Sequence, residues 1–166
     1  MKKRGISPLI ATVLILGFTV ALAAIIMTWG TGFTKRMQEQ TEETANVQIT
    51  CATDVVFDVK SACEDPVTGG TYKLTIANNG NKKIDKFQIR FYKAADDVKT
   101  VEYTFGGNGI EAFGIESESK TSGYLVADEV KQIEAIPVIT VSNKLITCAS
   151  NIDSFGNLEG SAIDNC

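Results

Sequence analysis

The chain has 166 residues, with 16 Lys and Arg against 20 Asp and Glu, no His, and a formal net charge of −4. This length allows one ordinary domain, or a small domain with one additional element. An acidic surface is poorly suited to nucleic-acid phosphates, which proteins bind largely through Lys and Arg, so we expect no nucleic-acid partner. Because His is absent, His-based catalytic triads and His-containing zinc sites are excluded.

The charges are divided unevenly along the chain. Lys2, Lys3 and Arg4 carry three positive charges, whereas residues 6–34 carry no charged side chain. Residues 35–46 contain two bases and three acids, and the rest of the chain contains 11 bases and 17 acids. A basic start is therefore followed by an uncharged segment of 29 residues and an acidic remainder.

The uncharged segment predicts a hydrophobic helix that is long enough to cross a membrane. A bilayer core needs roughly 20 apolar residues. The apolar residues fall on every side of the helix rather than along one stripe, so no side of it suits water. The preceding basic residues favour an N-terminus in the cytoplasm, with everything after residue 35 outside.

A secretory signal peptide that is cleaved and discarded is the alternative interpretation. Such a signal has an apolar core of about 7–15 residues, followed by a small-residue cleavage site. The uncharged segment is much longer, and its small-x-small sequence Ala21-Leu22-Ala23 lies inside the apolar run rather than after it. We therefore expect the helix to be retained.

Residues 35–46 (KRMQEQTEETAN) are rich in helix-forming residues and lack Pro and Gly. The helix is therefore predicted over residues 6–46, with a polar extension at its end. Pro8 suits its first turn, where the missing N–H costs nothing.

Beyond Asn46, apolar and polar residues alternate, beginning with Val47, Ile49 and Cys51. Seven or eight such short runs, separated by turns rich in Gly and Asn, predict an extracellular antiparallel β-sandwich of immunoglobulin-like size over residues 47–166. The predicted fold class is α+β, a long N-terminal hydrophobic helix followed by this head domain.

Two further details of the head can be predicted. Pro137 is expected at a sheet edge or a bulge, because it cannot donate a ladder hydrogen bond. Residues 149–166 are rich in Gly, Ser and Asn and are expected to form a loop.

The four cysteines, Cys51, Cys63, Cys148 and Cys166, all fall on the side predicted to be outside. In an oxidising compartment they predict two disulfides, for which three pairings exist. A straight strand over residues 53–62 would separate its ends by about 30 Å, which argues against a Cys51–Cys63 bond. Of the two remaining pairings we favour Cys63–Cys148 with Cys51–Cys166. A four-thiolate metal site is not expected, because there is no C-x-x-C pair.

No group of residues indicates catalysis, a cofactor or a metal. No nucleophile–base pair can be named, and residues 151–156 resemble a calcium loop only faintly. Phe155 occupies a ligand position of such a loop, and Ala162 stands where a closing Glu is needed. The chain is therefore predicted not to be an enzyme and to bind no cofactor.

The N-terminus carries a family resemblance. Lys2-Lys3-Arg4-Gly5, followed by residues 6–14 (ISPLIATVL), closely resembles archaeal type IV pilins with a class III signal peptide. The resemblance covers about residues 2–33. It implies that a prepilin peptidase removes residues 1–5 by cutting between Gly5 and Ile6, and that an assembly machinery then packs the retained helix into a surface filament.

The same resemblance sets the order of the functional hypotheses. Archaellins usually begin with a Gly-Ile-Gly-Thr-like stretch rather than Ser-Pro, so an adhesion-type pilin ranks above an archaellin-like motility subunit. The Glu that bacterial type IV pilins carry near the mature N-terminus is absent, so bacterial assembly contacts are not transferred. A monomeric membrane-anchored binding module is a further alternative.

The pilin hypothesis predicts a homo-oligomer, a helical filament of identical subunits on the archaeal cell surface, with a head that contacts an adhesion target. The precursor would be a single-pass protein of the cytoplasmic membrane. The small residues Gly17, Ala21, Ala24 and Thr28 would allow close approach of neighbouring helices. The residues expected to pack in the filament core are Pro8, Leu9, Val13, Leu16, Gly17, Val20, Ala21, Ala24, Ile25 and Thr28.

Overall fold

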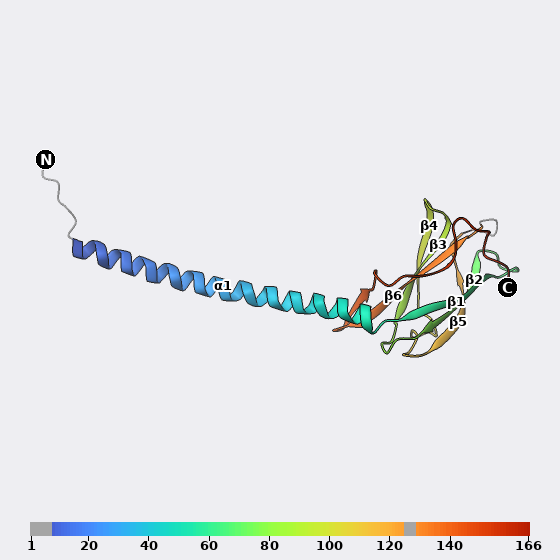
Figure 1. The fold of residues 1–166 in the computed structure, drawn as a ribbon, viewed down its shortest axis with the longest axis horizontal. Helices are drawn as coiled ribbons and strands as arrows, with labels where there is room; N and C mark the ends of the chain where they lie inside the picture. The colour runs from blue at the N-terminus through green and yellow to red at the C-terminus, as the bar shows by residue number, and fades with distance from the viewer. Residues whose placement is uncertain (1–7, 125–128) are drawn as a thin grey trace. The chain divides into compact units, whose positions relative to one another are not determined.

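The computed structural model describes residues 8–124 and 129–166 (Figure 1). The predicted leader, with Lys2, Lys3, Arg4 and the Gly5–Ile6 junction, lies outside the described residues. The chain divides after Ala45 into two compact units. The first contains most of one long helix, and the second contains the end of that helix and all of the strands.

Helix α1 spans Pro8–Thr53 and therefore extends seven residues beyond the predicted end. The prediction that Val47, Ile49 and Cys51 begin a strand is wrong. Val47 and Cys51 are four residues apart, so a helix places them on the same side, where they pack against the head core, and Ile49 is exposed. The alternation V-Q-I-T-C fits both periods, and these contacts decide for the helix.

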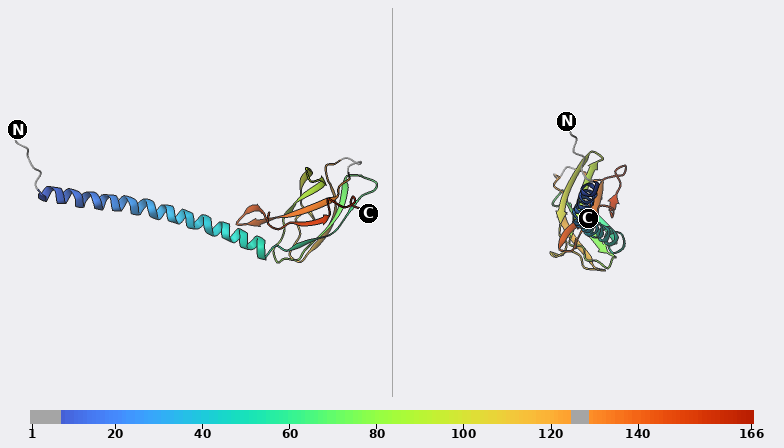
Figure 2. Two further views of the ribbon diagram at one scale, coloured as in Figure 1. Left: turned by 45° about the horizontal axis from the view of Figure 1, so that its top comes forward. Right: turned by 90° about the vertical axis from the view of Figure 1, so that its left-hand side faces the viewer.

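The second unit consists of two antiparallel sheets, which Figure 2 shows from two further directions. One sheet has the order β1-β2-β5. In the other, β4, β3 and β6 lie side by side, and both β7 and β8 pair with the remaining edge of β6. The fold is α+β with a sandwich-like head, as predicted. The strands are β1 (Phe57–Glu64), β2 (Thr71–Asn78), β3 (Lys86–Ala94), β4 (Asp97–Tyr103), β5 (Ile115–Thr121), β6 (Gln132–Val141), β7 (Lys144–Thr147) and β8 (Asp153–Gly156).

The core of the head lies between the two sheets. The rings of Tyr72 in β2 and Phe91 in β3 have centroids 5.6 Å apart, and those of Phe57 and Phe87 are 5.2 Å apart. The alternation that predicts strands places one side chain in two in this core. Its largest fully buried members are Tyr72, Leu74, Ile76, Ile84, Phe87, Ile89, Phe91, Phe105, Ile110, Ile133, Ile136 and Ile139.

Pro137 lies inside the five-stranded sheet, so its predicted position at an edge or bulge is wrong. It is opposite Phe87 of β3, and its carbonyl oxygen accepts a hydrogen bond from the Cys148 N–H (2.9 Å) on the other side of β6. The nitrogen of a strand residue faces the same side as its carbonyl. On that side β8 pairs as far as Ala135 and β7 begins at Val138, so the missing N–H falls between the two partners.

The structure joins Cys51 to Cys148 and Cys63 to Cys166, with Cα–Cα distances of 5.5 and 5.0 Å. The exclusion of a Cys51–Cys63 bond is confirmed, but the favoured pairing of Cys63 with Cys148 and Cys51 with Cys166 is wrong. The predicted loop over residues 149–166 contains β8, which runs antiparallel to β6 and carries the chain away from Cys148. The tail then reaches the end of β1, where the Cys166 N–H donates to the Glu64 carbonyl (2.8 Å).

Removing either disulfide is expected to lower the free energy of unfolding, and removing Cys51–Cys148 is expected to lower it more. The two bonds close loops of similar length, 97 and 103 residues apart, for which chain entropy predicts roughly 4–5 kcal/mol each. Cys51 and Cys148 are buried, whereas Cys166 is exposed. The C51S/C148S variant therefore also buries two hydroxyls, at a further cost of about 1–3 kcal/mol per unsatisfied group.

Guanidinium unfolding of the full chain in detergent micelles measures both effects, with C63S/C166S as the matched comparison. An equal or larger loss of unfolding free energy in C63S/C166S would contradict the prediction that the buried Cys51–Cys148 bond contributes more to stability.

Candidate functional site

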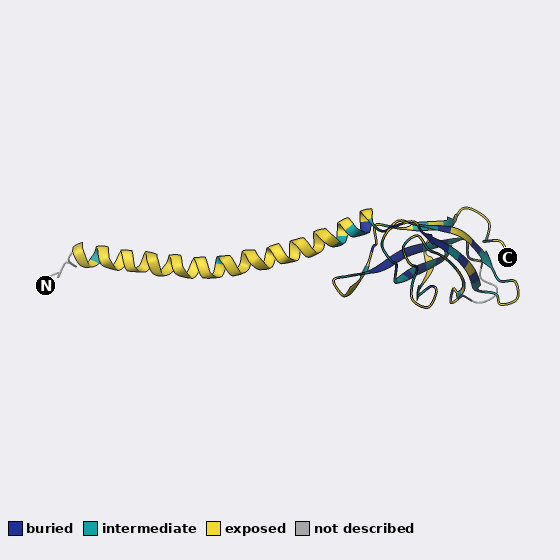
Figure 3. Ribbon diagram, turned by 90° about the horizontal axis from the view of Figure 1, so that it is seen from below, coloured by how far each residue is buried: buried dark blue, intermediate teal, exposed yellow. Residues whose placement is uncertain are grey.

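The most unusual surface of the chain is the first part of α1. Its residues before Asn46 are exposed, with only Ala11 and Gly30 partly covered (Figure 3). Leu9, Met27 and Trp29 are each 72% exposed. An apolar surface of this extent is not stable in water, so it marks a binding site for lipid or protein.

The residues predicted to pack in a filament core all lie in α1, and every one of them is exposed. Within this set the small residues Gly17, Ala21, Ala24 and Thr28 are spaced by three and four residues, which places them along one side of the helix. Around Gly17, apart from its chain neighbours and the backbone of its own helix, no atom lies within 4 Å of the position that a Cβ would occupy. This side therefore has space for a close neighbour, although its contact with sister copies remains a prediction.

The threonines of the apolar segment do not make it polar. Thr12 donates its hydroxyl hydrogen bond to the Leu9 carbonyl (2.9 Å), and Thr19 donates to the Leu16 carbonyl (2.9 Å). The hydroxyls of Thr28, Thr31 and Thr34 donate in the same way to carbonyls of the preceding turn. Because each hydroxyl has a partner within the helix, all five can enter an apolar environment without losing a hydrogen bond.

The apolar segment ends in an aromatic pair and two bases. Trp29 and Phe33 stack with centroids 5.6 Å apart, and Lys35 and Arg36 follow directly. Trp is enriched at membrane–water interfaces, and basic side chains extend from helix ends toward water. Among the described residues, α1 is the one helix that is long and apolar enough to cross a membrane.

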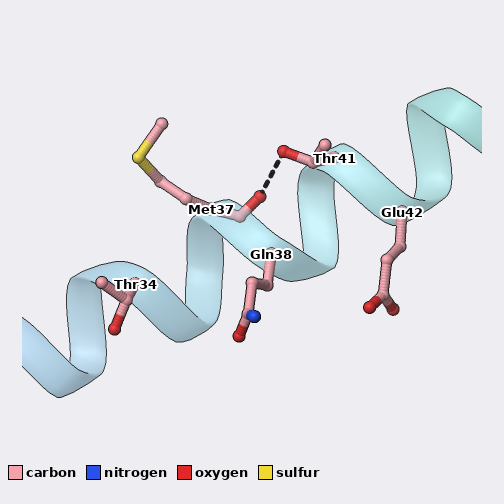
Figure 4. A pocket seen from close by; sticks show the side chains of 5 residues that line it. All are labelled: Thr34, Met37, Gln38, Thr41 and Glu42. Atoms are coloured by element: carbon pink, nitrogen blue, oxygen red, sulfur yellow. Dashed lines mark hydrogen bonds between the residues drawn. The ribbon is translucent and has the colours of Figure 1, made fainter.

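The polar part of α1 provides no cavity for a ligand. Figure 4 shows Thr34, Met37, Gln38, Thr41 and Glu42 along the surface of this single helix, without a wall from another element. Thr41 donates its hydroxyl to the Met37 carbonyl (2.7 Å). These side chains form an open helix surface.

The last turns of α1 belong to the head. Cys51 is buried and bonded to Cys148. The side-chain amide of Asn151 donates to the carbonyls of Cys51 (2.6 Å) and Val55 (2.7 Å). A helix leaves its final carbonyls without helical partners, so this amide supplies the Cys51 carbonyl with a donor that the helix end lacks and also holds the segment that follows the helix.

The segment that follows the helix is held on a second side. The Asn79 N–H donates to the Val56 carbonyl (2.7 Å), and Gly80 lies so close that a Cβ there would be 2.2 Å from the Asp54 carbonyl oxygen. The Asp153 carboxylate accepts a hydrogen bond from the Val59 N–H (2.6 Å). Residues 51–59 are therefore fixed between the segment after β7 and the turn after β2.

Two residues from the faint calcium-loop sequence, Asn151 and Asp153, thus act as hydrogen-bond partners of the helix end and of β1. Among residues 8–124 and 129–166, no group of three or more Asp, Glu or Cys side chains is arranged to hold a metal ion. Sequence analysis missed the role of these two residues, because their partners lie about 100 positions earlier. The Asn-x-Asp pattern indicates a local turn at most.

No protein-family model matches the chain, and a search of the curated proteins finds no match either.

Replacing Asn151 by Ala is expected to destabilise the junction of α1 with the head. Two partly buried carbonyls lose a donor, which predicts a loss of about 1–3 kcal/mol in the free energy of unfolding. Hydrogen exchange at residues 50–56 should rise, because the helix end opens more often. Asn108→Ala, at an exposed loop position, is the control and should leave both measurements unchanged. Equal behaviour of the two variants would contradict the role assigned to Asn151.

Proposed function

We propose that the chain is a pilin, a structural subunit whose α1 becomes the core of a surface filament similar to archaeal type IV pili. The observation that carries the proposal is the exposed helix of residues 8–34, which is apolar on all sides and whose threonine hydroxyls are all bonded internally. Such a helix has two favourable environments, a lipid bilayer and a bundle of similar helices. In a helical filament each copy is surrounded by others, which requires an apolar surface in every direction.

Transfer from lipid to such a bundle cannot depend on the hydrophobic effect alone. Lipid tails are already apolar, so helices in membranes associate mainly through close packing. Gly17, Ala21 and Ala24 on one side of α1 permit that packing. Because this transfer gains little free energy, an assembly machinery is needed to move the helix from the membrane into the filament.

The basic leader would oppose assembly until it is removed. Lys2, Lys3 and Arg4 carry three charges that a dry helix bundle could not pair, and each unpaired buried charge costs several kcal/mol. Cleavage between Gly5 and Ile6 by a prepilin peptidase would remove them. It would therefore control the step from a membrane-bound precursor to a filament subunit.

The head suits an extracellular position on such a filament. Its two disulfides are stable in an oxidising environment, and its acidic charge keeps it soluble. A solvent-facing head is available for contact with other cells or surfaces. We assign the filament to adhesion rather than motility because Ser7-Pro8 differs from the Gly-Ile-Gly-Thr-like start of archaellins.

A monomeric membrane anchor is the second candidate function. It is favoured by the stacked Trp29 and Phe33 and the adjacent Lys35 and Arg36, which suit a bilayer interface. In that case the helix would remain in lipid, and the head would act alone as a binding module.

The state of the N-terminus distinguishes these functions. The mature protein is expected to begin at Ile6 and to be released from cells by shearing as thin filaments. Mass spectrometry of the N-terminal peptide and electron microscopy of the sheared fraction measure both properties. Gly5→Val should block processing, because the peptidase reads the residue before the cut. Intact Met1 in a protein that stays monomeric in detergent would instead establish the anchor.

A substitution on the small-residue side separates packing from membrane insertion. Ala21→Leu adds apolar bulk, which a bilayer accepts but a close helix–helix contact does not, so the yield of filaments should fall about tenfold or more. The membrane-bound precursor should remain at its normal level. Ala95→Leu adds the same bulk at an exposed position in the turn between β3 and β4 of the head and should assemble normally. Normal filament yield from Ala21→Leu would contradict close packing on this side.

A further inference from the structure

The polar part of α1 carries charges of both signs in separate blocks. Lys35 and Arg36 come first, and Glu39, Glu42 and Glu43 follow within two turns. All five side chains are on the exposed helix surface. Figure 4 shows Glu42 extending away from the helix, on the same side as Gln38. The block order gives this segment a basic end nearer the apolar residues and an acidic end nearer the head.

The spacing of the two blocks is regular. Lys35 and Glu42 are seven residues apart, and so are Arg36 and Glu43. Seven residues make nearly two full turns, so each base lies on the same side of the helix as its acid. At 1.5 Å per residue, the base and the acid of each pair are separated by about 10 Å along the axis. The pairs Lys35–Glu42 and Arg36–Glu43 therefore have the same axial separation.

We propose that this segment binds a second copy of the chain, parallel to the first and shifted by about 10 Å along the helix axis. At that shift Lys35 and Arg36 of one copy lie against Glu42 and Glu43 of the next. The inference rests on the proposed filament function, because copies that enter a membrane with the same topology are parallel. It adds to that function the element that determines the axial position of neighbouring subunits.

The apolar segment restricts this position only through its packing. Gly17, Ala21 and Ala24 favour some alignments over others, but a helix displaced along its axis still meets apolar side chains and leaves no charge unpaired. The charged blocks do discriminate between positions. Two copies in register would place Lys35 and Arg36 against the same bases and the acids against acids, whereas the shifted arrangement pairs opposite charges.

Pairing within one helix is a weaker use of these charges. Along the chain the bases precede the acids, and a base placed four residues before an acid is the less favourable orientation within a helix. On a neighbouring copy that is shifted by two turns, the acids lie opposite these bases. A helix bundle exposes such charge pairs less to dissolved salt than an isolated helix does, so their attraction is screened less. Ion pairing between copies is therefore expected to be stronger than ion pairing within one helix.

Two complementary variants test the inference in cells that lack the wild-type chain. K35E/R36E makes the segment wholly acidic, and E42K/E43K leaves it mostly basic. The yield of sheared filaments from each variant alone should fall by about tenfold or more, because like charges on neighbouring copies then face each other. Both variants together should restore filaments that contain the two chains in similar amounts. K35R/R36K retains the charges and is the matched control, which should assemble normally.

The outcomes are distinguishable. Circular dichroism and thermal unfolding of each variant in detergent should match the wild type, because the substituted side chains are exposed. Normal filaments from either single variant, or no recovery from the mixture, would overturn the charge pairing while leaving the filament function in place. Absence of filaments from the wild-type chain would instead overturn the proposed function itself.

Discussion

A helix with no side suited to water has to be covered by something, and this constraint governs about the first fifth of the chain. Burying one large aliphatic side chain is worth about 1.5–3 kcal/mol relative to water, and residues 8–34 carry such side chains on every side. The threonine hydroxyls place no limit on burial, because each already bonds a carbonyl of its own helix. The cover must therefore be lipid or protein, and in the proposed filament it is a layer of identical helices.

The end of α1, in contrast, already packs against the rest of the head. There the helix becomes part of a packed domain, with Cys51 buried and bonded to Cys148 and with Asn151 bonded to two carbonyls. Gly80 permits a backbone approach that any side chain would prevent. These contacts connect the element proposed for assembly to the element proposed for adhesion through a covalent bond as well as the main chain. They also explain why a segment rich in β-branched residues remains helical.

Between these two regions lies a short polar segment with its own information. An apolar surface stabilises contact and restricts position only through its packing, whereas separated charges disfavour misaligned positions and add less stability. The basic block next to the apolar segment and the acidic block nearer the head meet both needs within one continuous helix. Affinity and register can therefore be assigned to different parts of the same element.

The sequence alone determined the features that depend on local pattern. The apolar helix follows from the absence of charge over residues 6–34, the strands follow from alternation, and the exclusion of a Cys51–Cys63 bond follows from strand length. Tertiary structure decided the rest. The helical state of Val47 and Cys51, the central place of Pro137 and the pairing of Cys63 with Cys166 all depend on partners distant in the sequence. Local periodicity cannot distinguish two conformations that both place apolar side chains inward; only the position of the distant partner does so.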